Sequence, residues 1–361
     1  MRRERNQYIF ASELTKRSRS HRFRTAVLIL LPVLIIALVV MNATVTHRIR
    51  LEEIRLTVLD LPDDLENFSI LHLSDLHGAR YGETQKAVRD ALGTTRYSCV
   101  VMTGDMLGED GDVEPLLELI DLMPQDTPKF LIPGDTDGPA VATQAHSSLS
   151  VYTEWAERLK AAGVQILELP VLITREKKGR IWFVPEELYA LDLDGMQKNY
   201  QRQLDSLNSR KPSLSADDAA HIRALEYELE RIEALRGIKK EFQSTDIQVV
   251  LTHTPLSEDY LTDLVSWSAK NDLFSLRYAS LILAGHYNGG QWRIPGVGAV
   301  YVPELGWFPE DEQVMGLSYV GSVPQYISPG MGSDPHYEHQ PGRIFNSPVI
   351  TKIVLTRKAT K

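Results

Sequence analysis

Five short apolar runs, each ending in a polar or glycine-rich turn, constrain the fold of this chain more than any other feature. They are FSILHLSDLH, YSCVVMTGDM, PKFLIPGDTD, IQVVLTHTP and ASLILAGHYN. Stretches with helical spacing lie between several of them, at 113–123 and 151–162. Strands that alternate with helices indicate an α/β fold with largely buried strands, and ligands bind such folds at the carboxyl ends of the strands.

The pattern changes twice further along the chain. Residues 194–242 carry apolar side chains at helical spacing on both sides of KPSLSADD, which predicts an inserted helical hairpin with Ser215 as a helix cap. A lid or spacer is the simpler role for this hairpin, and a partner-binding arm is the alternative. After Gly298 the helical spacing fades, and strand-like runs predict a second sheet packed on the first.

The chain begins with a basic tail and an uncharged apolar segment. Residues 1–24 contain eight Lys or Arg and two Glu, and TAVLILLPVLIIALVVMNATV follows at 25–45. This segment is long enough to cross a bilayer, and the basic residues before it predict a cytoplasmic amino terminus. We therefore expect a single-pass transmembrane anchor in the cell membrane, with the domain at 46–361 outside the cytoplasm. A cleaved signal peptide is the alternative, because small residues follow the apolar run.

Composition and charge exclude several classes of protein. The chain is 43% hydrophobic and 24% charged, which is globular composition. When the tail is subtracted from 39 basic and 48 acidic residues, 31 basic and 46 acidic residues remain, and this negative charge argues against nucleic-acid binding. Cys99 is the only cysteine, so there is no disulfide framework. The absence of G-x-x-x-x-G-K-[ST] and G-x-S-x-G argues against an NTPase or an acyl-enzyme hydrolase.

Each of the five apolar runs is followed by groups that can bind a metal or donate hydrogen bonds. These groups are Asp75 and His77, then Asp105, then Asp135, Thr136 and Asp137, then His253, and finally His286. Aspartate together with neutral imidazole suits Mn, Fe or Zn better than Ca or Mg. One bridging carboxylate can hold two cations roughly 3.5 to 4 Å apart, and such a pair binds the attacking and leaving oxygens of a phosphoryl displacement.

The order and types of these residues resemble the motifs D-x-H, G-D, G-N-H-D, H and G-H-x-H of the calcineurin-like metallophosphoesterases. The resemblance covers about 68–355, apart from the hairpin, and the G-H-x-x-G-G-Q and RIFNSPVITKIVL stretches are similar to the membrane-anchored bacterial subgroup. It implies a four-layer αββα sandwich with two divalent metal ions. The implied activity is hydrolysis of a phosphomonoester, phosphodiester or pyrophosphate bond by metal-hydroxide attack. A lipid-linked phosphoester is one candidate substrate.

The resemblance also implies a set of metal ligands. The first metal would take Asp75, His77 and Asp105, and the second would take Asp105, His253 and His286. Asp105 would then bridge the two metals.

Three positions depart from the family pattern. Asp135 stands for the asparagine of G-N-H-D and can still bind a metal, whereas Thr136 stands for the histidine that assists the leaving group. Asn288 stands for the second histidine of G-H-x-H and is a weaker ligand than imidazole. A catalytically weak relative that binds a phosphorylated envelope component or a partner protein is therefore the alternative function.

Other histidines and aromatic residues have simpler explanations. His72 precedes Asp75 in the same apolar run and is best explained as a core residue. Three loop histidines could replace the missing acid, although solvated loop histidines are commoner: His146, His336 and His339. Three aromatic residues could form an apolar rim of the cleft or pack under the second sheet: Trp292, Trp307 and Phe308.

Overall fold

The structure is a computed structural model that describes residues 5–145, 149–174, 179–210, 213–271, 279–334 and 342–357. It divides into two compact units, 1–47 and 48–361. The first unit contains helix α1 (Arg5–Thr46) with Pro32 inside it. Phe23–Thr46 contains an 18-residue window with a mean hydropathy of 2.9, and it is the one helix in the described ranges that is long and apolar enough to cross a membrane. A signal sequence has the same properties.

The second unit contains two mixed sheets of six strands each. The first sheet has the order β1 (Arg50–Thr57), β16 (Val349–Thr356), β2 (Ser69–Leu73), β3 (Cys99–Thr103), β4 (Lys129–Ile132) and β5 (Val164–Ile166). The second has the order β14 (Gly316–Val320), β15 (Val323–Ile327), β9 (Ala279–Ala284), β8 (Ile247–Leu251), β7 (Arg180–Pro185) and β6 (Val171–Thr174). Strands β2 to β5 run parallel, as do β7, β8, β9 and β15, which confirms the predicted α/β class.

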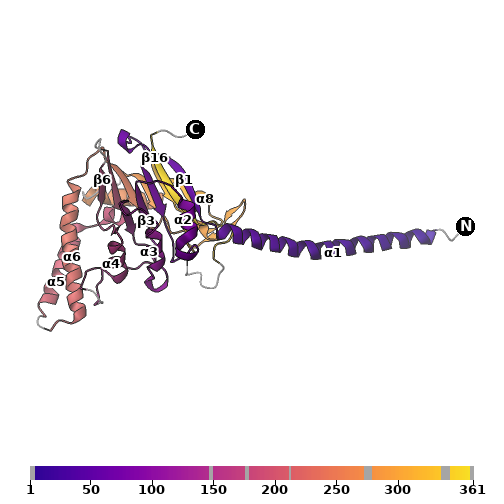
Figure 1. The fold of residues 1–361 in the computed structure, drawn as a ribbon, viewed down its shortest axis with the longest axis horizontal. Helices are drawn as coiled ribbons and strands as arrows, with labels where there is room; N and C mark the ends of the chain where they lie inside the picture. Colours follow the sequence, from indigo (N-terminus) through magenta and orange to yellow (C-terminus); the bar gives the residue numbers. More distant parts are fainter. Residues whose placement is uncertain are drawn as a thin grey trace. The chain divides into compact units, whose positions relative to one another are not determined.

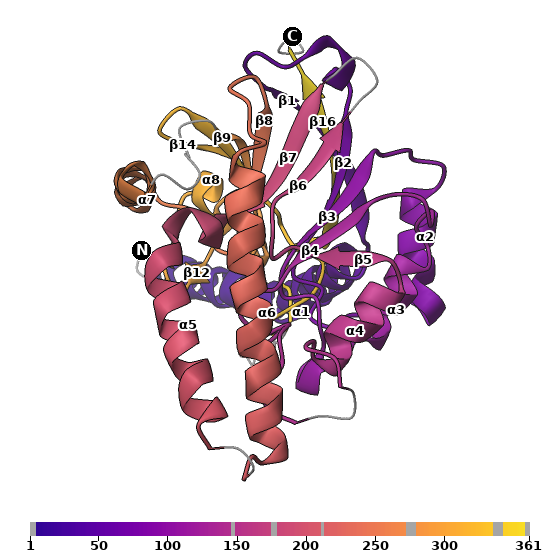
Figure 2. The ribbon, with the colours of Figure 1, turned by 90° about the vertical axis from the view of Figure 1, so that its left-hand side faces the viewer.

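The two sheets pack face to face, and helices cover their outer faces (Figures 1 and 2). Side chains alternate along each strand, so Ile70 of β2 faces the core between the sheets while Leu71 faces the helices. Phe130 and Phe183 meet across the inner core with ring centroids 5.1 Å apart. This layering agrees with the sandwich that the resemblance implies.

Different helices cover the two outer faces. The first sheet is covered by α2 (Lys86–Leu92), α3 (Glu114–Ile120) and α4 (Glu154–Ala161). The second is covered by α5 (Leu193–Asn208), α6 (Ala216–Lys239) and α7 (Glu258–Asn271). Ser215 caps α6, because its hydroxyl accepts from Asp218 N and the Asp218 carboxylate accepts from Ser215 N.

Shorter elements complete the unit. They are the 3₁₀ turns Asp63–Leu65, Glu83–Gln85, Glu109–Gly111, Glu186–Ala190 and Asn288–Gly290, helix α8 (Asp311–Val314), and the ribbons β10 (Arg293–Ile294) with β11 (Gly298–Ala299) and β12 (Tyr301–Val302) with β13 (Gly306–Trp307).

The predicted origin of the second sheet is wrong in part. The second sheet is built mainly from β6 to β9, with β14 and β15 added at one edge. Strand β16 instead joins the first sheet, where it pairs with β1 in parallel and with β2 in antiparallel register. The pattern of β16 shows that it is apolar but does not identify its partners, so periodicity alone could not assign it to a sheet.

Candidate functional site

The predicted site residues converge from both sheets. Asp75 and Asp105 follow the ends of β2 and β3 by two residues in the first sheet. His253 and His286 follow the ends of β8 and β9 by two residues in the second sheet. Neighbouring parallel strands deliver their carboxyl ends to the same edge, so each sheet brings two of these side chains to the line where the sheets meet.

The backbone bends sharply at these positions. Five residues without the freedom of glycine adopt left-handed φ angles: Asp75 (52°), His77 (46°), Asp105 (55°), His286 (78°) and Asn288 (50°). Such a conformation costs roughly 1–3 kcal/mol at each residue and persists where the surrounding structure enforces it. All five belong to the predicted site, where the side chains are aimed at one point, although eight other non-glycine residues of the described chain also have positive φ angles.

Glycines allow the loops to approach each other closely. A Cβ atom on Gly104 would lie 2.6 Å from Gly134 Cα and 2.7 Å from His253 Nδ1. A Cβ atom on Gly134 would lie 2.4 Å from Asp105 Oδ1. The glycines of the G-D motifs are therefore required by contact between the loops.

Two triads of potential ligands share one carboxylate. Asp75, His77 and Asp105 form the first, and Asp105, His253 and His286 form the second, with the ligand atoms of each triad within 4.8 Å of one another. Asp105 Oδ2 lies 3.7 Å from His77 Nε2 and 3.3 Å from His253 Nε2. The structure thus brings the five residues into two adjacent groups around Asp105.

Hydrogen bonds orient the side chains of both triads. His253 Nδ1 lies 2.7 Å from the Thr103 carbonyl, which accepts its hydrogen, so Nε2 faces Asp105 Oδ2 and lies 3.2 Å from His286 Nδ1. Thr136 N donates to Asp105 Oδ1 at 2.8 Å, and His286 N donates to Asp75 Oδ1 at 2.9 Å. Each carboxylate therefore keeps one oxygen on the backbone.

The directions of the pKa shifts indicate that positive charge stabilises the buried carboxylates of this cluster. Burial alone lowers the pKa of His253, but the hydrogen bond to Asp105 and the charges of Asp75 and Asp105 raise it to about 9. Burial raises the pKa of Asp75, and the nearby imidazoles only partly oppose this effect. Burial also acts to raise the pKa of Asp105, but His253 and His77 hold it well below its usual range. A proton or a metal cation would offset the buried negative charge.

Asn288 is buried beside the first triad, but its amide nitrogen faces the cluster. Asn288 Nδ2 lies 3.4 Å from His77 Nε2, while Oδ1 accepts from Arg343 Nη2 at 3.4 Å. Arg343 is buried and also donates to the carbonyls of Gly332 and Pro329. In this orientation Asn288 offers no lone pair to a cation, so a ligand role requires its amide to turn.

The other two departures lie at the second triad. The Asp135 side chain is 67% exposed, and its Oδ2 lies 3.4 Å from His286 Nδ1 and 3.8 Å from His253 Nε2. The Thr136 hydroxyl is buried and has no hydrogen-bond partner within the described part of the chain.

The remaining candidates divide between the core, the surface and undescribed segments. His72 is a core residue as expected: its Nε2 lies 2.9 Å from Thr103 Oγ1, and burial lowers its pKa to about 3. Trp292 is partly buried, whereas Trp307 and Phe308 are exposed and do not pack under the second sheet. Three loop histidines lie outside the described residues: His146, His336 and His339.

Sequence reasoning named Asp137 only as a group that follows an apolar run, and it missed the role of this and several other residues that support the site. Asp137 accepts from the backbone of Met106, Leu107 and Gly134, and so ties the two G-D loops together. The Ser74 hydroxyl donates to Asp75 Oδ2. Arg343 and Asn346 hold the GHYNGG loop, where Asn346 Nδ2 donates to Asn288 O at 2.8 Å. Two signals were available: Asp137 stands in GDTD, and Arg343 and Asn346 stand in the RIFNSPVITKIVL stretch. Neither signal indicates the contacts with Asn288, which is 55 or more positions away from Arg343 and Asn346.

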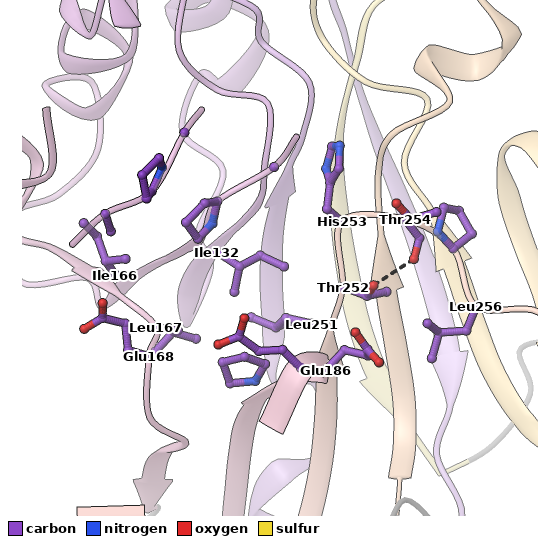
Figure 3. A pocket seen from close by; sticks show the side chains of 18 of the residues that line it. Ile132, Ile166, Leu167, Glu168, Glu186, Leu251, Thr252, His253, Thr254 and Leu256 are labelled. Atoms are coloured by element: carbon purple, nitrogen blue, oxygen red, sulfur yellow. Dashed lines mark hydrogen bonds between the residues drawn. The ribbon is translucent and has the colours of Figure 1, made fainter. Parts of the chain in front are cut away.

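A cavity of about 820 Å³ adjoins the second triad at His253 and Gly134. It lies between the carboxyl ends of β4 and β5 on one sheet and β7 and β8 on the other. Figure 3 shows apolar side chains such as Ile132 and Leu251 beside the carboxylates of Glu168 and Glu186. Arg231 also lines the cavity, but Glu187 and Glu228 pair with its guanidinium. The cavity therefore suits an uncharged group better than an anion.

Of three comparisons with known proteins, the match to a family model supports this arrangement. No curated protein matches the chain. Among solved structures, phosphopantetheinyl hydrolase from Mycobacterium tuberculosis is similar at 14% identity and a TM-score of 0.35, over 73% of this chain and 89% of that one. This similarity carries no argument about the site. The calcineurin-like phosphoesterase family matches residues 68–288, more than half of the chain and the segment that holds both triads. The chain therefore belongs to the calcineurin-like phosphoesterases, a family of phosphoester hydrolases that bind two metal ions.

Proposed function

We propose that this protein is a membrane-anchored phosphoesterase whose two divalent metals, Mn, Fe or Zn, are held outside the cytoplasm. The shared position of Asp105 carries the proposal, because one carboxylate serves both triads. The donor set fits metals: His253 Nε2 and His286 Nδ1 approach to 3.2 Å beside the Asp105 carboxylate. A cation between these atoms would satisfy their lone pairs and offset the buried charge of Asp75.

Residues of the chain would bind the two metal ions and orient the side chains that hold them. When bound, two divalent cations supply a nucleophile at neutral pH and neutralise the charge that develops on a transferred phosphoryl group. Asp105 holds both triads together, and Thr136 N fixes its second oxygen. Glu304 lies 3.6 Å from His286 Nε2 and can orient that ring from the side opposite the cluster.

The charge around the site favours a phosphodiester over a phosphomonoester. The exposed carboxylate of Asp135 stands beside His253 and His286, so it repels a dianionic monoester more strongly than a monoanionic diester. The adjoining cavity has room for a second, uncharged alcohol group of a diester. A diester with at least one apolar alcohol is therefore the substrate class that we propose.

Metal content and turnover of the full-length protein test this function. We expect the parent to bind metal and to hydrolyse bis(p-nitrophenyl) phosphate faster than p-nitrophenyl phosphate. Asp105→Ala should lose more metal than Asn288→Ala, because Asp105 serves both triads while the amide oxygen of Asn288 faces Arg343. Asp121→Ala, on the surface at the end of α3, is the matched control and should behave as the parent.

Two results would decide against the proposal. Equal metal content in Asp105→Ala and the parent would exclude a shared bridging ligand. Full metal loading without hydrolysis of either ester would instead favour the alternative, a relative that binds a phosphorylated envelope component or a partner without turnover.

A further inference from the structure

A group of exposed apolar side chains lies in the segment that follows the GHYNGG loop. We call it the aromatic patch, and it comprises Ile294 (44% exposed), Val297 (64%), Tyr301 (39%), Trp307 (72%) and Phe308 (58%). Soluble monomeric proteins rarely expose a contiguous group of large apolar side chains, and where they do, the group often forms a binding site.

Two short β-ribbons fix the positions of the side chains of the aromatic patch. Its two ribbons, β10 with β11 and β12 with β13, place Tyr301 opposite Trp307 with ring centroids 5.0 Å apart. The other face of the segment is buried, where Ala299, Val302 and Val314 form a small core. The backbone therefore sorts its side chains into an inward and an outward set, and the outward set includes the aromatic rings.

The patch adjoins the metal-binding cluster. Tyr301 and Glu304 line the same small depression as His286 and Asn288. Arg293, at the base of the first ribbon, donates to Gly289 O at 3.0 Å. The patch and the candidate catalytic site thus share one end of the domain.

The chain enters the domain at this same end. Arg50, the first residue of β1, pairs with Val349 of β16. Two residues further along β16, Thr351 pairs with His72 of β2, which lies three residues before Asp75. Helix α1 ends at Thr46, so four residue steps separate it from β1. Four extended steps span at most about 14 Å. An anchored α1 would therefore hold this end of the domain close to the lipid.

We propose that the aromatic patch rests on the lipid surface in which α1 is anchored and presents the metal-binding end of the domain to phosphoesters carried by lipids. This inference rests on the proposed anchoring and phosphoesterase function. Trp and Tyr side chains favour the membrane interface, where an apolar ring and a polar atom are both accommodated. The domain is acidic, and Glu304 and Asp311 lie beside the patch, so the contact is apolar and needs no anionic lipid.

Two phosphodiesters with the same leaving group test the inference. Full-length protein is reconstituted in phosphatidylcholine vesicles and given either hexadecyl p-nitrophenyl phosphate in the bilayer or methyl p-nitrophenyl phosphate in solution. We expect the double variant Trp307→Ser, Phe308→Ser to lose about tenfold in rate on the bilayer ester, because membrane contact scales with buried apolar area. Its rate on the methyl ester should stay close to that of the parent, which also reports that the variant folds.

Leu59→Ser is the matched control. Leu59 is 84% exposed and follows β1 at the end of the sheet away from the site, where Thr57 pairs with Thr356. This variant should hydrolyse both esters as the parent does.

A second readout does not depend on turnover. Phosphatidylcholine with brominated acyl chains should quench part of the tryptophan emission of the parent, and Trp307→Phe should remove the quenched part. Unchanged quenching in Trp307→Phe, or equal loss on both esters in the double variant, would overturn the inference. A parent that hydrolyses neither ester would instead refute the phosphoesterase function, and the quenching would still decide whether the patch meets lipid.

Discussion

Thr136 stands beside the second triad, at the position where the family resemblance places a proton-donating histidine. Its backbone nitrogen holds Asp105, while its buried hydroxyl has no partner in the described ranges. A threonine hydroxyl cannot give up a proton near neutral pH. The departing alcohol then leaves unprotonated, or it takes its proton from water, from the substrate or from one of the loop histidines: His146, His336 and His339.

Restoring the imidazole should change the preference for leaving groups. General acid assistance contributes roughly 10²- to 10⁴-fold and matters most for poor leaving groups. We therefore expect Thr136→His to raise the rate on a dialkyl phosphodiester more than on a nitrophenyl ester, at matched metal loading. Thr136→Val, which keeps the shape and loses the hydroxyl, should leave both rates near the parent. An equal response of the two ester classes to Thr136→His would show that position 136 is not the vacant acid site.

The pKa of His253 predicts how the metal-free protein responds to pH. Because its folded pKa of about 9 exceeds the ordinary value of 6.5, protonated His253 stabilises the fold below pH 6.5. That contribution is lost as the pH rises to about 9, and the raised pKa of Asp75 acts in the same direction. Thermal unfolding of the chelator-treated full chain should therefore show declining stability between pH 6.5 and 9. His253→Gln should flatten this slope, and an unchanged slope would contradict the assignment.

At the scale of elements, the loops that follow the strands approach each other closely at glycine residues. Substituting alanine, which adds one methyl group, tests whether such a close approach is required. Gly285 has an ordinary φ, so a substitution there acts through contact alone. A Cβ atom on Gly285 would lie 1.8 Å from Ser74 Oγ and 2.9 Å from Asp75 Oδ2. The end of β9 therefore packs directly on the end of β2, and this contact joins the two sheets at the site.

Gly285→Ala should lower metal content and thermal stability together, because it pushes Ser74 and Asp75 away from the cluster. Adding Ser74→Gly should restore part of both, since it removes the nearest clashing atoms. Gly237→Ala in α6, where a Cβ would meet nothing within 4 Å, is the control and should stabilise the protein by about 0.5–1 kcal/mol. Equal effects of Gly285→Ala and Gly237→Ala would contradict the contact argument.

The sequence was informative about strands and weak about their partners. The five apolar runs predict β2, β3, β4, β8 and β9, because buried parallel strands read as continuous apolar runs. The partners of β16 were not predictable, since pairing with β1 and β2 involves residues nearly 300 positions apart. The left-handed φ angles of Asp75 and Asp105 were not predictable for the same reason, because they depend on distant contacts. Arg343 lies in the RIFNSPVITKIVL stretch, but the sequence does not show that it is buried against Asn288, 55 positions away.

At the scale of the whole molecule, the basic tail and the apolar segment predict the topology. Eight basic residues precede the segment, so we expect the domain outside the cytoplasm. Protease added to intact protoplasts should digest residues after 47 and leave an amino-terminal tag protected. Recovery of an intact domain would overturn this orientation. Release of the domain without α1 would instead show that the apolar segment is a cleaved signal.

The short connection between α1 and β1 has a consequence for kinetics. With α1 in a bilayer, four residue steps restrict the domain to a layer next to the lipid, where its encounters with lipid substrates occur by diffusion in two dimensions. The rate then depends on the number of substrate molecules per unit area of membrane, and dilution of the surrounding medium leaves it unchanged. Diluting the substrate with inert lipid should slow each enzyme molecule in proportion.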